Sequence, residues 1–382
     1  MGFLIIDFTI LCFRLPRPPL ASKPPGSQWP DYFNNWLYSC KLQNVCDSVY
    51  ILLFICFLCM SRFLLILSYC VIFSSLWIIF FPTWYVFDVA ISFLPYLIVL
   101  YTFFVWYWIA QCIFVRLYWQ YVVFVFVFLF FALKFTPIIT HFYQGLTAPS
   151  IYKTGDVRVL YANIRKDNVD YSWLLAMVDK YDPDMVLFVE FADHHDIHMK
   201  SYFSKKYPYI NRTTWSQKFI WSIVFSKIPI TNLADKFPQG AWRYGYFSID
   251  LGNHPYYLYL VHTSSPTSPF NADMRNNQFA SVIHDMQIHE KKFPRADILL
   301  LGDFNVTPWS IFYQQFVAQL PYFTDITNRF SLLFTWRLYW FPLFRAHIDH
   351  IFTNQPSFIN SLQSISVPGS DHRGYMFTIM NY

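Results

Sequence analysis

The stretch DILLLGDFN, residues 297–305, runs a series of apolar residues directly into a glycine, a carboxylate and an amide. A short apolar run bounded by turn-forming residues is typical of a buried strand. Such a strand would end at Asp303 and Asn305, whose side chains can bind a cation and orient water. The position of these two residues at a strand end is the first indication of a site.

A βαβ unit leads into this strand. Residues 256–263 alternate like a strand, and residues 272–290 have the spacing of a helix. A right-handed crossover makes the two strands of such a unit parallel, so their carboxyl ends lie at the same edge of a sheet. We therefore expect His262, at the end of the first strand, to lie beside Asp303.

A second βαβ unit is predicted earlier in the chain. Its strands are residues 157–163 and 184–191, and its helix is residues 170–181. The carboxyl ends of these strands carry Asn163 and Glu190. The two units together predict an α/β fold with polar side chains gathered at strand ends.

The C-terminal part of the chain adds further candidates. The strand pattern 347–353 contains Asp349, and the loop before the last strand contains Asp371 and His372. Each of these residues alone is compatible with a turn, a helix cap or a hydrogen-bonded core histidine. Their shared position at the ends of apolar strands favours a single site. Oxygen ligands at one edge suit a magnesium ion, and phosphoester hydrolysis needs charge neutralisation and an aimed water.

The apolar residues are distributed unevenly. The 382-residue chain is 55% hydrophobic, yet residues 150–382 carry 21 of the 28 Lys and Arg residues and 19 of the 23 Asp and Glu residues. This composition predicts a membrane part followed by a water-soluble part with a net charge of only +2 (21 minus 19). A membrane span needs about 20 mostly apolar residues. Three runs meet or approach this length, and we predict spans over residues 63–81, 89–110 and 119–135.

The predicted organisation has four parts. They are a proline-rich and poorly defined segment 1–59, a transmembrane region 60–140, a linker 141–154 and a catalytic domain 155–382. Arg62 precedes the first span, and Arg116 lies between the second and the third. The positive-inside rule places these arginines in the cytoplasm. We therefore expect an integral membrane protein with an extracytoplasmic catalytic domain.

The motifs of the soluble part resemble those of a known superfamily. In chain order they are YANIR, LFVEF, VHTSSP, LLLGDFN, HIDHIF and GSDHRGY, over about residues 155–382. This ordered set is similar to the endonuclease/exonuclease/phosphatase superfamily, and especially to bacterial members with N-terminal membrane spans. The resemblance implies a four-layer α/β/β/α sandwich of two packed mixed sheets, and a phosphoesterase that depends on Mg²⁺ or Mn²⁺.

The resemblance also implies roles for the polar residues. Glu190, Asn163 and Asp371 would belong to the metal site. His262 would contact the phosphate, Asp303 and Asn305 would handle the nucleophilic water, and Asp349 would orient His372. We also predict substrate contacts for Arg165 and Arg275. Arg165 stands where some nucleases of the family have a supporting aspartate, which weakens an argument for DNA repair.

The substrate is left open between nucleic acid and a phospholipid or inositol phosphate. The low net charge of the domain argues against a dedicated duplex-DNA binder. An alternative of another class is a non-catalytic, membrane-tethered binding or assembly protein with the same fold. The aromatic stretch 332–345 is either a packed strand and loop or a surface for bases or lipid. If it is exposed next to a bilayer, it favours an amphiphilic substrate.

Overall fold

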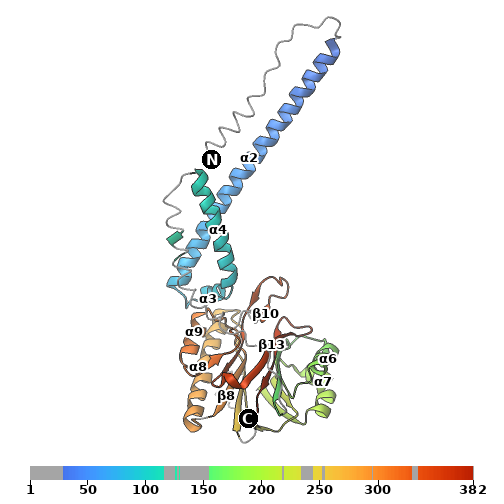
Figure 1. Cartoon of the computed structure of the whole chain (residues 1–382), viewed down its shortest axis with the longest axis vertical. Coiled ribbons are helices and arrows are strands. Elements are labelled where there is room, and N and C mark those ends of the chain that lie inside the picture. The colour runs from blue at the N-terminus through green and yellow to red at the C-terminus, as the bar shows by residue number, and fades with distance from the viewer. Residues whose placement is uncertain are drawn as a thin grey trace. The chain divides into compact units, whose positions relative to one another are not determined.

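The structure is a computed structural model that describes most of the chain (Figure 1). The described residues are 29–115, 125, 126, 129, 155–216, 219–233, 244–251, 254–294, 296–328 and 334–381. Two compact units emerge from the contacts. The first contains residues 1–79 and 96–132, and the second contains Phe80–Pro95 and Leu133–Tyr382. The second unit thus includes a short segment that was predicted to belong to the transmembrane region.

Three helices with defined bounds precede the sheets in the described part of the chain. They are α2 (Trp29–Phe80), α3 (Tyr85–Ile91) and α4 (Leu94–Val115). The Arg62–Phe80 part of α2 is long and apolar enough to cross a membrane. Helix α3 and the Leu94–Ile109 part of α4 meet at a bend of 76°, so the predicted span 89–110 is broken rather than continuous.

The N-terminal segment differs from its prediction. Residues 29–59 were expected to be poorly defined, but they form the first part of α2. The reason is that no glycine or proline occurs between residues 31 and 80, so the helix continues until Pro82 prevents it. Residues 1–28, the linker 141–154 and nearly all of the predicted span 119–135 lie outside the described residues.

The second unit contains two six-stranded mixed sheets among its described residues. In spatial order, the first sheet consists of β13 (Ile359–Ser366), β14 (Arg373–Ile379), β1 (Val157–Asn163), β2 (Met185–Val189), β4 (Phe219–Ser226) and β3 (Tyr209–Ser216). The second sheet consists of β5 (Ile230–Asn232), β6 (Tyr244–Leu251), β7 (His254–His262), β8 (Asp297–Asp303), β12 (Asp349–Thr353) and β9 (Thr324–Asp325). A separate hairpin pairs β10 (Trp336–Arg337) with β11 (Arg345–Ala346).

Both predicted βαβ units are present. Strands β1 and β2 are parallel and are joined through α6 (Tyr171–Tyr181), and β7 and β8 are parallel and are joined through α8 (Pro269–Lys292). The chain also forms α7 (Asp193–Lys206), α9 (Ile311–Ala318) and the short 3-10 helix η2 (Pro356–Phe358).

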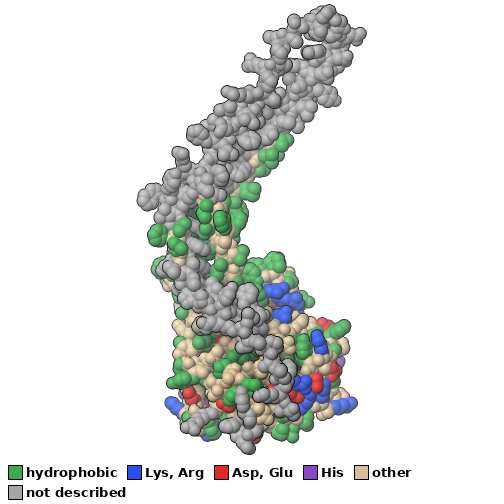
Figure 2. Space-filling view, in the orientation of Figure 1, with side chains coloured by type: hydrophobic (Ala, Val, Ile, Leu, Met, Phe, Trp, Pro, Cys, Tyr) green, Lys and Arg blue, Asp and Glu red, His purple; other side chains and the backbone are tan. Residues whose placement is uncertain are grey.

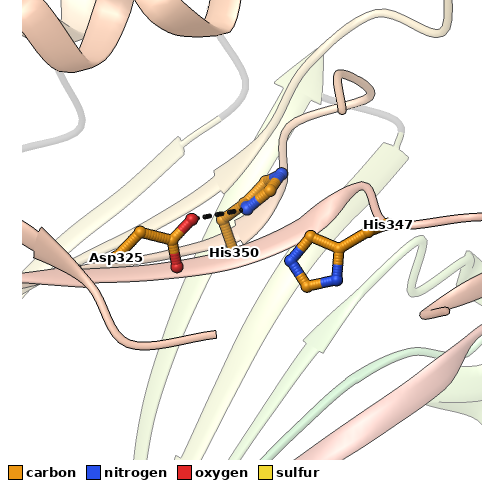
Figure 3. Close-up of side chains that lie close together, drawn as sticks. All are labelled: Asp325, His347 and His350. Atoms are coloured by element: carbon orange, nitrogen blue, oxygen red, sulfur yellow. Dashed lines mark hydrogen bonds and ion pairs between the residues drawn. The ribbon is translucent and has the colours of Figure 1, made fainter. Parts of the chain in front are cut away.

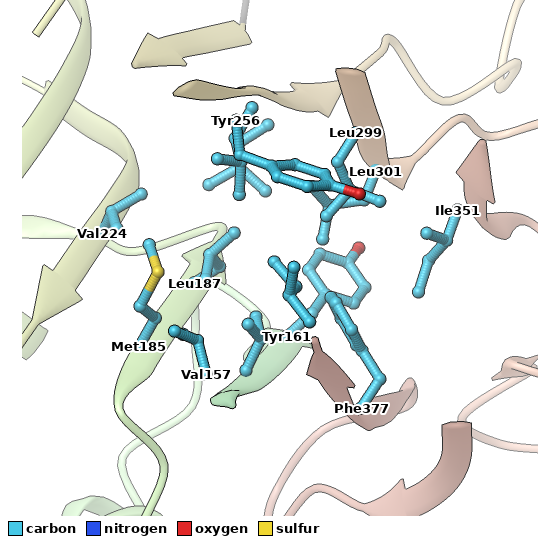
Figure 4. Close-up of a cluster of buried hydrophobic side chains, with 14 of the residues drawn as sticks. Val157, Tyr161, Met185, Leu187, Val224, Tyr256, Leu299, Leu301, Ile351 and Phe377 are labelled. Carbon is cyan, nitrogen blue, oxygen red and sulfur yellow. The ribbon is translucent and has the colours of Figure 1, made fainter. Parts of the chain in front are cut away.

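The two sheets pack face to face, with helices on their outer faces. Apolar residues alternate along β1, so that Val159 and Tyr161 point to the other sheet while Leu160 points to the helices. Figure 4 shows the layer between the sheets, where Tyr161 faces Leu301 of β8. Figure 1 shows α8 and α9 on one side of the sheets and α6 and α7 on the other. Two mixed sheets with flanking helices confirm the predicted sandwich.

Candidate active site

The strand ends bring the predicted polar residues to one edge. Asn163 ends β1 opposite Val189 of β2, and Glu190 follows directly. His262 ends β7 opposite Asp303, the last residue of β8. Asp349, the first residue of β12, also pairs with Asp303. Residues separated by up to 209 positions, as for Asn163 and His372, therefore come within hydrogen-bonding range.

The backbone at this edge adopts conformations that are uncommon elsewhere. Glu190, Asn305 and Arg165 have φ angles of 57°, 50° and 63°, although none is a glycine. Gly302 has a φ of 147°, and a Cβ there would lie 1.8 Å from the carbonyl oxygen of Val261. Only glycine allows β8 to approach β7 this closely. Such strained positions are concentrated at functional sites.

Asp303 and Asn305 are held by each other and by the backbone. The Asn305 amide N–H donates to Asp303 Oδ1 over 2.9 Å, and Asn305 Nδ2 donates to the carbonyl of Thr263 over 3.0 Å. Asp303 Oδ2 accepts a hydrogen bond of 3.0 Å from Asn163 Nδ2. Burial raises the pKa of Asp303 well above its usual range, Asp349 adds to the rise, and His372 opposes it.

His372 is oriented by Asp349. His372 Nδ1 donates to Asp349 Oδ2 over 2.9 Å, and Tyr161 donates its hydroxyl to Asp349 Oδ1 over 2.7 Å. Burial lowers the pKa of His372, but the carboxylates of Asp349 and Asp303 outweigh it and raise the pKa to about 10. His372 Nε2 lies 3.7 Å from Asp303 Oδ2. A charged N–H is thus held close to the predicted base.

Glu190 is the centre of a candidate metal site. Its ligand atoms and those of His262 and Asp303 all lie within 4.8 Å of one another. Burial acts to raise the pKa of Glu190, yet the charges of His262 and His372 leave it below its usual value. The ionised carboxylate of Glu190 next to the buried carboxylate of Asp303 suits a divalent cation that prefers oxygen ligands. Asn163 turns its Nδ2 toward Glu190 and Asp303 and its Oδ1 toward the Arg165 amide, so here it orients the carboxylates.

A cavity of about 920 Å³ opens onto these groups. Its polar lining includes Glu190, His262, Asp303, Asn305 and His372. Asn163 and Asp349, both fully buried, stand behind the lining and contact it through hydrogen bonds.

The remaining predicted residues are placed differently. Arg165 lines the cavity with its guanidinium 4.4 Å from the ring centre of Tyr339. Asp371 also lines the cavity, but its Oδ2 accepts a hydrogen bond from Trp336 Nε1, and it is not part of a metal cluster among the described residues. Arg275 is only 1% exposed and does not line the cavity, because its guanidinium is paired with Asp88 at 2.8 Å. This placement does not support the predicted substrate contact of Arg275.

A second buried cluster has the same residue types but a different character. Asp325, His347 and His350 lie close together, and Figure 3 shows His350 directed at Asp325. The Asp325 carboxylate accepts from His350 Nδ1, from the Tyr313 hydroxyl, and from both the amide and the hydroxyl of Thr327.

Asp325 and His350 of this second cluster are already engaged by protein groups. His350 Nε2 lies 2.9 Å from the carbonyl of Val306 and Nδ1 lies 2.7 Å from Asp325 Oδ2, so both ring nitrogens of His350 already have partners. The four donors around Asp325 leave its oxygens saturated. The Asp325 cluster is therefore a structural network beneath the site.

Two contributors were absent from the sequence prediction. Tyr161 supports Asp349 from the β1 motif YAN, where its position in the strand interior indicated only a core residue. Thr335 accepts a hydrogen bond of 3.1 Å from the Asp349 amide. Thr335 belongs to the aromatic stretch 332–345, for which the sequence predicted either a packed strand and loop or a surface for bases or lipid.

A protein-family match covers most of the second unit. Residues 160–372, more than half of the chain, match the Endonuclease/Exonuclease/phosphatase family. The chain belongs to this family. It is therefore a metal-dependent hydrolase of phosphoester bonds, as the motifs predicted.

Solved structures with a similar chain fold have low sequence identity. D. rerio TDP2 complexed with single strand DNA product is 15% identical, with a TM-score of 0.49 over 59% of this chain and 99% of that chain. The human Nocturnin catalytic domain with bound sulfate is 14% identical, with a TM-score of 0.46 over 61% of this chain and 97% of that chain. A beta toxin of Staphylococcus aureus is 17% identical, with a TM-score of 0.44 over 59% and 100%. Comparison with curated proteins gives no match.

Proposed function

We propose that this chain is a membrane-anchored phosphoesterase that uses Mg²⁺ or Mn²⁺ to hydrolyse phosphodiester or phosphomonoester bonds. The observation that carries the proposal is the meeting of Asp303, Asn305 and His372 at one cavity, with Glu190 beside them. A proton acceptor, a water-orienting amide and a charged donor are what attack by water on phosphorus requires.

Asp303 and Asn305 would handle the water. Asn305 is fixed through its amide N–H and its Nδ2, so its Oδ1 is the part of the side chain that can accept a hydrogen bond from water. Asp303 Oδ2 would accept the first proton as the water oxygen bonds to phosphorus. The ester P–O bond then breaks, one water proton ends on the departing alcohol, and the other ends on the phosphate product.

His372 would stabilise the charge that develops on the phosphoryl group. Its Nδ1–H is engaged by Asp349, and its pKa of about 10 keeps the ring protonated at neutral pH. The Nε2–H can then donate to a phosphoryl oxygen. Such positioned acid–base groups contribute about 10²- to 10⁴-fold in rate.

Glu190 would hold the cation, since its ligand atom lies within 4.8 Å of those of His262 and Asp303. When bound there, the cation neutralises negative charge on the phosphoryl oxygens. The choice between Mg²⁺ and Mn²⁺ is part of the proposal, since oxygen-rich sites suit both.

Membrane anchoring is supported by the apolar helix Arg62–Phe80 and the bent pair that follows it. The extracytoplasmic location has two supports. Arg62 lies on the side of the helix that the positive-inside rule assigns to the cytoplasm. Phe80–Pro95 follows the other end of this helix and belongs to the same compact unit as the catalytic domain. A reporter enzyme that is active only outside the cytoplasm should therefore be active when it is fused after Tyr382. A reporter that is active only in the cytoplasm should be inactive at the same position.

The direct test uses the full chain in detergent with soluble phosphodiesters and monoesters, a single-stranded oligonucleotide and a phospholipid. We expect turnover with Mg²⁺ or Mn²⁺, its loss with a chelator, and a fall of about 10²-fold or more in kcat for Asp303→Asn. Asp273→Asn, at an exposed position of α8, is the matched control and should behave like wild type. A folded wild-type protein that is inert on every substrate would refute the proposal.

A further inference from the structure

The segment Phe80–Pro95 is built into the catalytic unit. Asp88 of α3 is 1% exposed and pairs with Arg275 of α8 at 2.8 Å. The Ser310 hydroxyl donates to the other oxygen of Asp88, and Trp309 Nε1 donates to the carbonyl of Ser92 over 3.1 Å. Buried charges persist only where their partners are well placed, so these contacts fix α3 firmly against the unit.

The same contacts reach the catalytic residues. Arg275 Nη1 donates to the carbonyl of Asn305 over 3.1 Å while Nη2 holds Asp88. One guanidinium therefore ties the segment to the loop that orients the nucleophilic water. The segment Phe80–Pro95 is therefore linked through one residue to the catalytic loop.

The segment also forms part of the cavity wall. Val89 and Phe93 line the cavity together with Met274, Leu338 and Ile348. The phosphate-handling residues belong to the same lining. The cavity therefore offers polar groups for a phosphoester and apolar side chains for whatever the phosphoester carries. A substrate that is polar throughout gains nothing from the apolar side chains.

Apolar side chains continue from the cavity to the surface. The loop between β10 and β11 exposes Tyr339, Trp340 and Leu343 by 64%, 78% and 70%. Phe344 of this loop packs against Phe93 at 5.4 Å between ring centres. Figure 2 shows hydrophobic side chains at the end of the unit where Figure 1 labels β10. Exposed aromatic residues of this kind suit the boundary between lipid and water.

The segment Phe80–Pro95 is joined directly to the predicted membrane helices. Phe80 is the last residue of the apolar helix Arg62–Phe80, and Leu94 begins the next apolar helix. If Arg62–Phe80 crosses the membrane, the segment that follows it starts at the membrane surface. Val89 and Phe93 follow Phe80 by 9 and 13 residues, so the chain itself tethers the apolar lining of the cavity to the end of that helix.

We infer that the substrate of this site is a phosphoester of a membrane lipid, with its headgroup at the polar residues and its hydrocarbon against Val89 and Phe93. This inference rests on the proposed function and names its substrate class. The reaction is unchanged, because water adds to phosphorus and the ester oxygen leaves with one proton.

The test compares substrates that differ in one property. The full chain in mixed micelles is assayed on a long-chain phospholipid, on its short-chain water-soluble analogue with the same headgroup, and on a single-stranded oligonucleotide. We expect kcat/KM to be at least about tenfold higher for the long-chain lipid than for its analogue, because several methylene groups are buried. Equal rates for the two lipids, or a preference for the oligonucleotide, would overturn the inference and leave the phosphoesterase function intact.

Variants locate the preference in the segment. Val89→Ser and Phe93→Ser should lower the ratio of kcat/KM for the long-chain lipid to that for the short-chain analogue by about tenfold. Val86→Ser is the matched control, since Val86 is 64% exposed on the same helix and does not line the cavity. Val89→Ser is compared alone with the control if Phe93→Ser does not fold. An unchanged ratio in the folded Val89 and Phe93 variants would contradict the inference, and no turnover on any substrate would refute the proposed function with it.

Discussion

Strand β12 carries two adjacent residues that belong to two buried histidine–carboxylate pairs on opposite faces of one sheet. Asp349 pairs with His372 at 2.9 Å, and the next residue, His350, pairs with Asp325 at 2.7 Å. The second nitrogen of His350 donates to a backbone carbonyl, whereas His372 lines the cavity. Each histidine is thus paired with a buried carboxylate. Chemistry also requires a ring nitrogen that substrate can reach.

The largest expected difference between the pairs concerns removal of each histidine. His372→Ala should lower kcat by about 10²- to 10⁴-fold. His350→Ala leaves the Asp325 charge uncompensated in the core and should cost about 3–5 kcal/mol of unfolding free energy, with little change in kcat of the folded protein. Steady-state kinetics and detergent-matched unfolding curves measure both effects. His284→Ala, at an exposed position of α8, is the neutral control.

The contrast between the two histidine–carboxylate pairs would be refuted if the losses of kcat and of stability were exchanged between the two variants. A His350→Ala protein that is fully folded but inactive would place catalysis in the second cluster. A His372→Ala protein with normal kcat would remove His372 from the mechanism.

A second difference concerns pH, measured as unfolding free energy in the presence of a chelator. Burial acts to raise the pKa of Asp325, but His350, His347 and the Thr327 hydrogen bond together outweigh burial, so the pKa lies below its usual value. Asp325 therefore contributes stability above its unfolded pKa of about 3.9, and the contribution is lost as pH falls through the folded pKa. The gap between wild type and Asp325→Asn should shrink in acid.

The His372 pair should show the opposite dependence. Its pKa is raised to about 10, so its contribution is complete below the unfolded value of about 6.5 and is lost as pH rises through about 10. The gap between wild type and His372→Gln should narrow in alkali. A gap that widens in alkali would show that His372 is not held in its charged form.

The smallest expected effect separates two tyrosines with equivalent contacts. Tyr161 donates to Asp349 over 2.7 Å, and Tyr313 donates to Asp325 over 2.6 Å. Loss of one such bond costs about 0.5–1.5 kcal/mol, so Tyr161→Phe should lower kcat by about threefold to tenfold. Tyr313→Phe should lower stability by a similar free energy and leave kcat unchanged. Equal kcat values for the two variants would mean that Asp349 needs no support from Tyr161.

The site was largely predictable because its signals are local. Strand periodicity and the crossover rule predicted Asn163 and Glu190 at the edge of one βαβ unit, and His262 and Asp303 at the edge of the other. Their common position at strand ends then favoured a single site. The role of Arg275 was not predictable, because its partner lies 187 residues earlier in the chain. Asp88 did leave a signal, since it is the sole carboxylate between residues 48 and 155. A lone charge in an apolar stretch indicates a buried partner elsewhere in the fold.

The second cluster was missed for a related reason. His350 belongs to the motif HIDHIF, where it follows Asp349 directly, and alternation along the strand sends the two side chains to opposite faces. Strand periodicity predicts that the side chains of Asp349 and His350 point to opposite faces of the sheet. It does not predict that Asp325 lies on the face of His350. That pairing depends on the short strand β9, whose two residues give no strand pattern in the sequence.

The most direct test of the central claim is binding of Mn²⁺ to the full chain, followed by electron paramagnetic resonance. The Glu190, His262 and Asp303 cluster should bind the ion, and Glu190→Gln should weaken binding by about tenfold or more. Folded Asp325→Asn should bind Mn²⁺ like wild type. Normal binding by Glu190→Gln, with binding lost in Asp325→Asn, would place the metal in the wrong cluster and contradict the account.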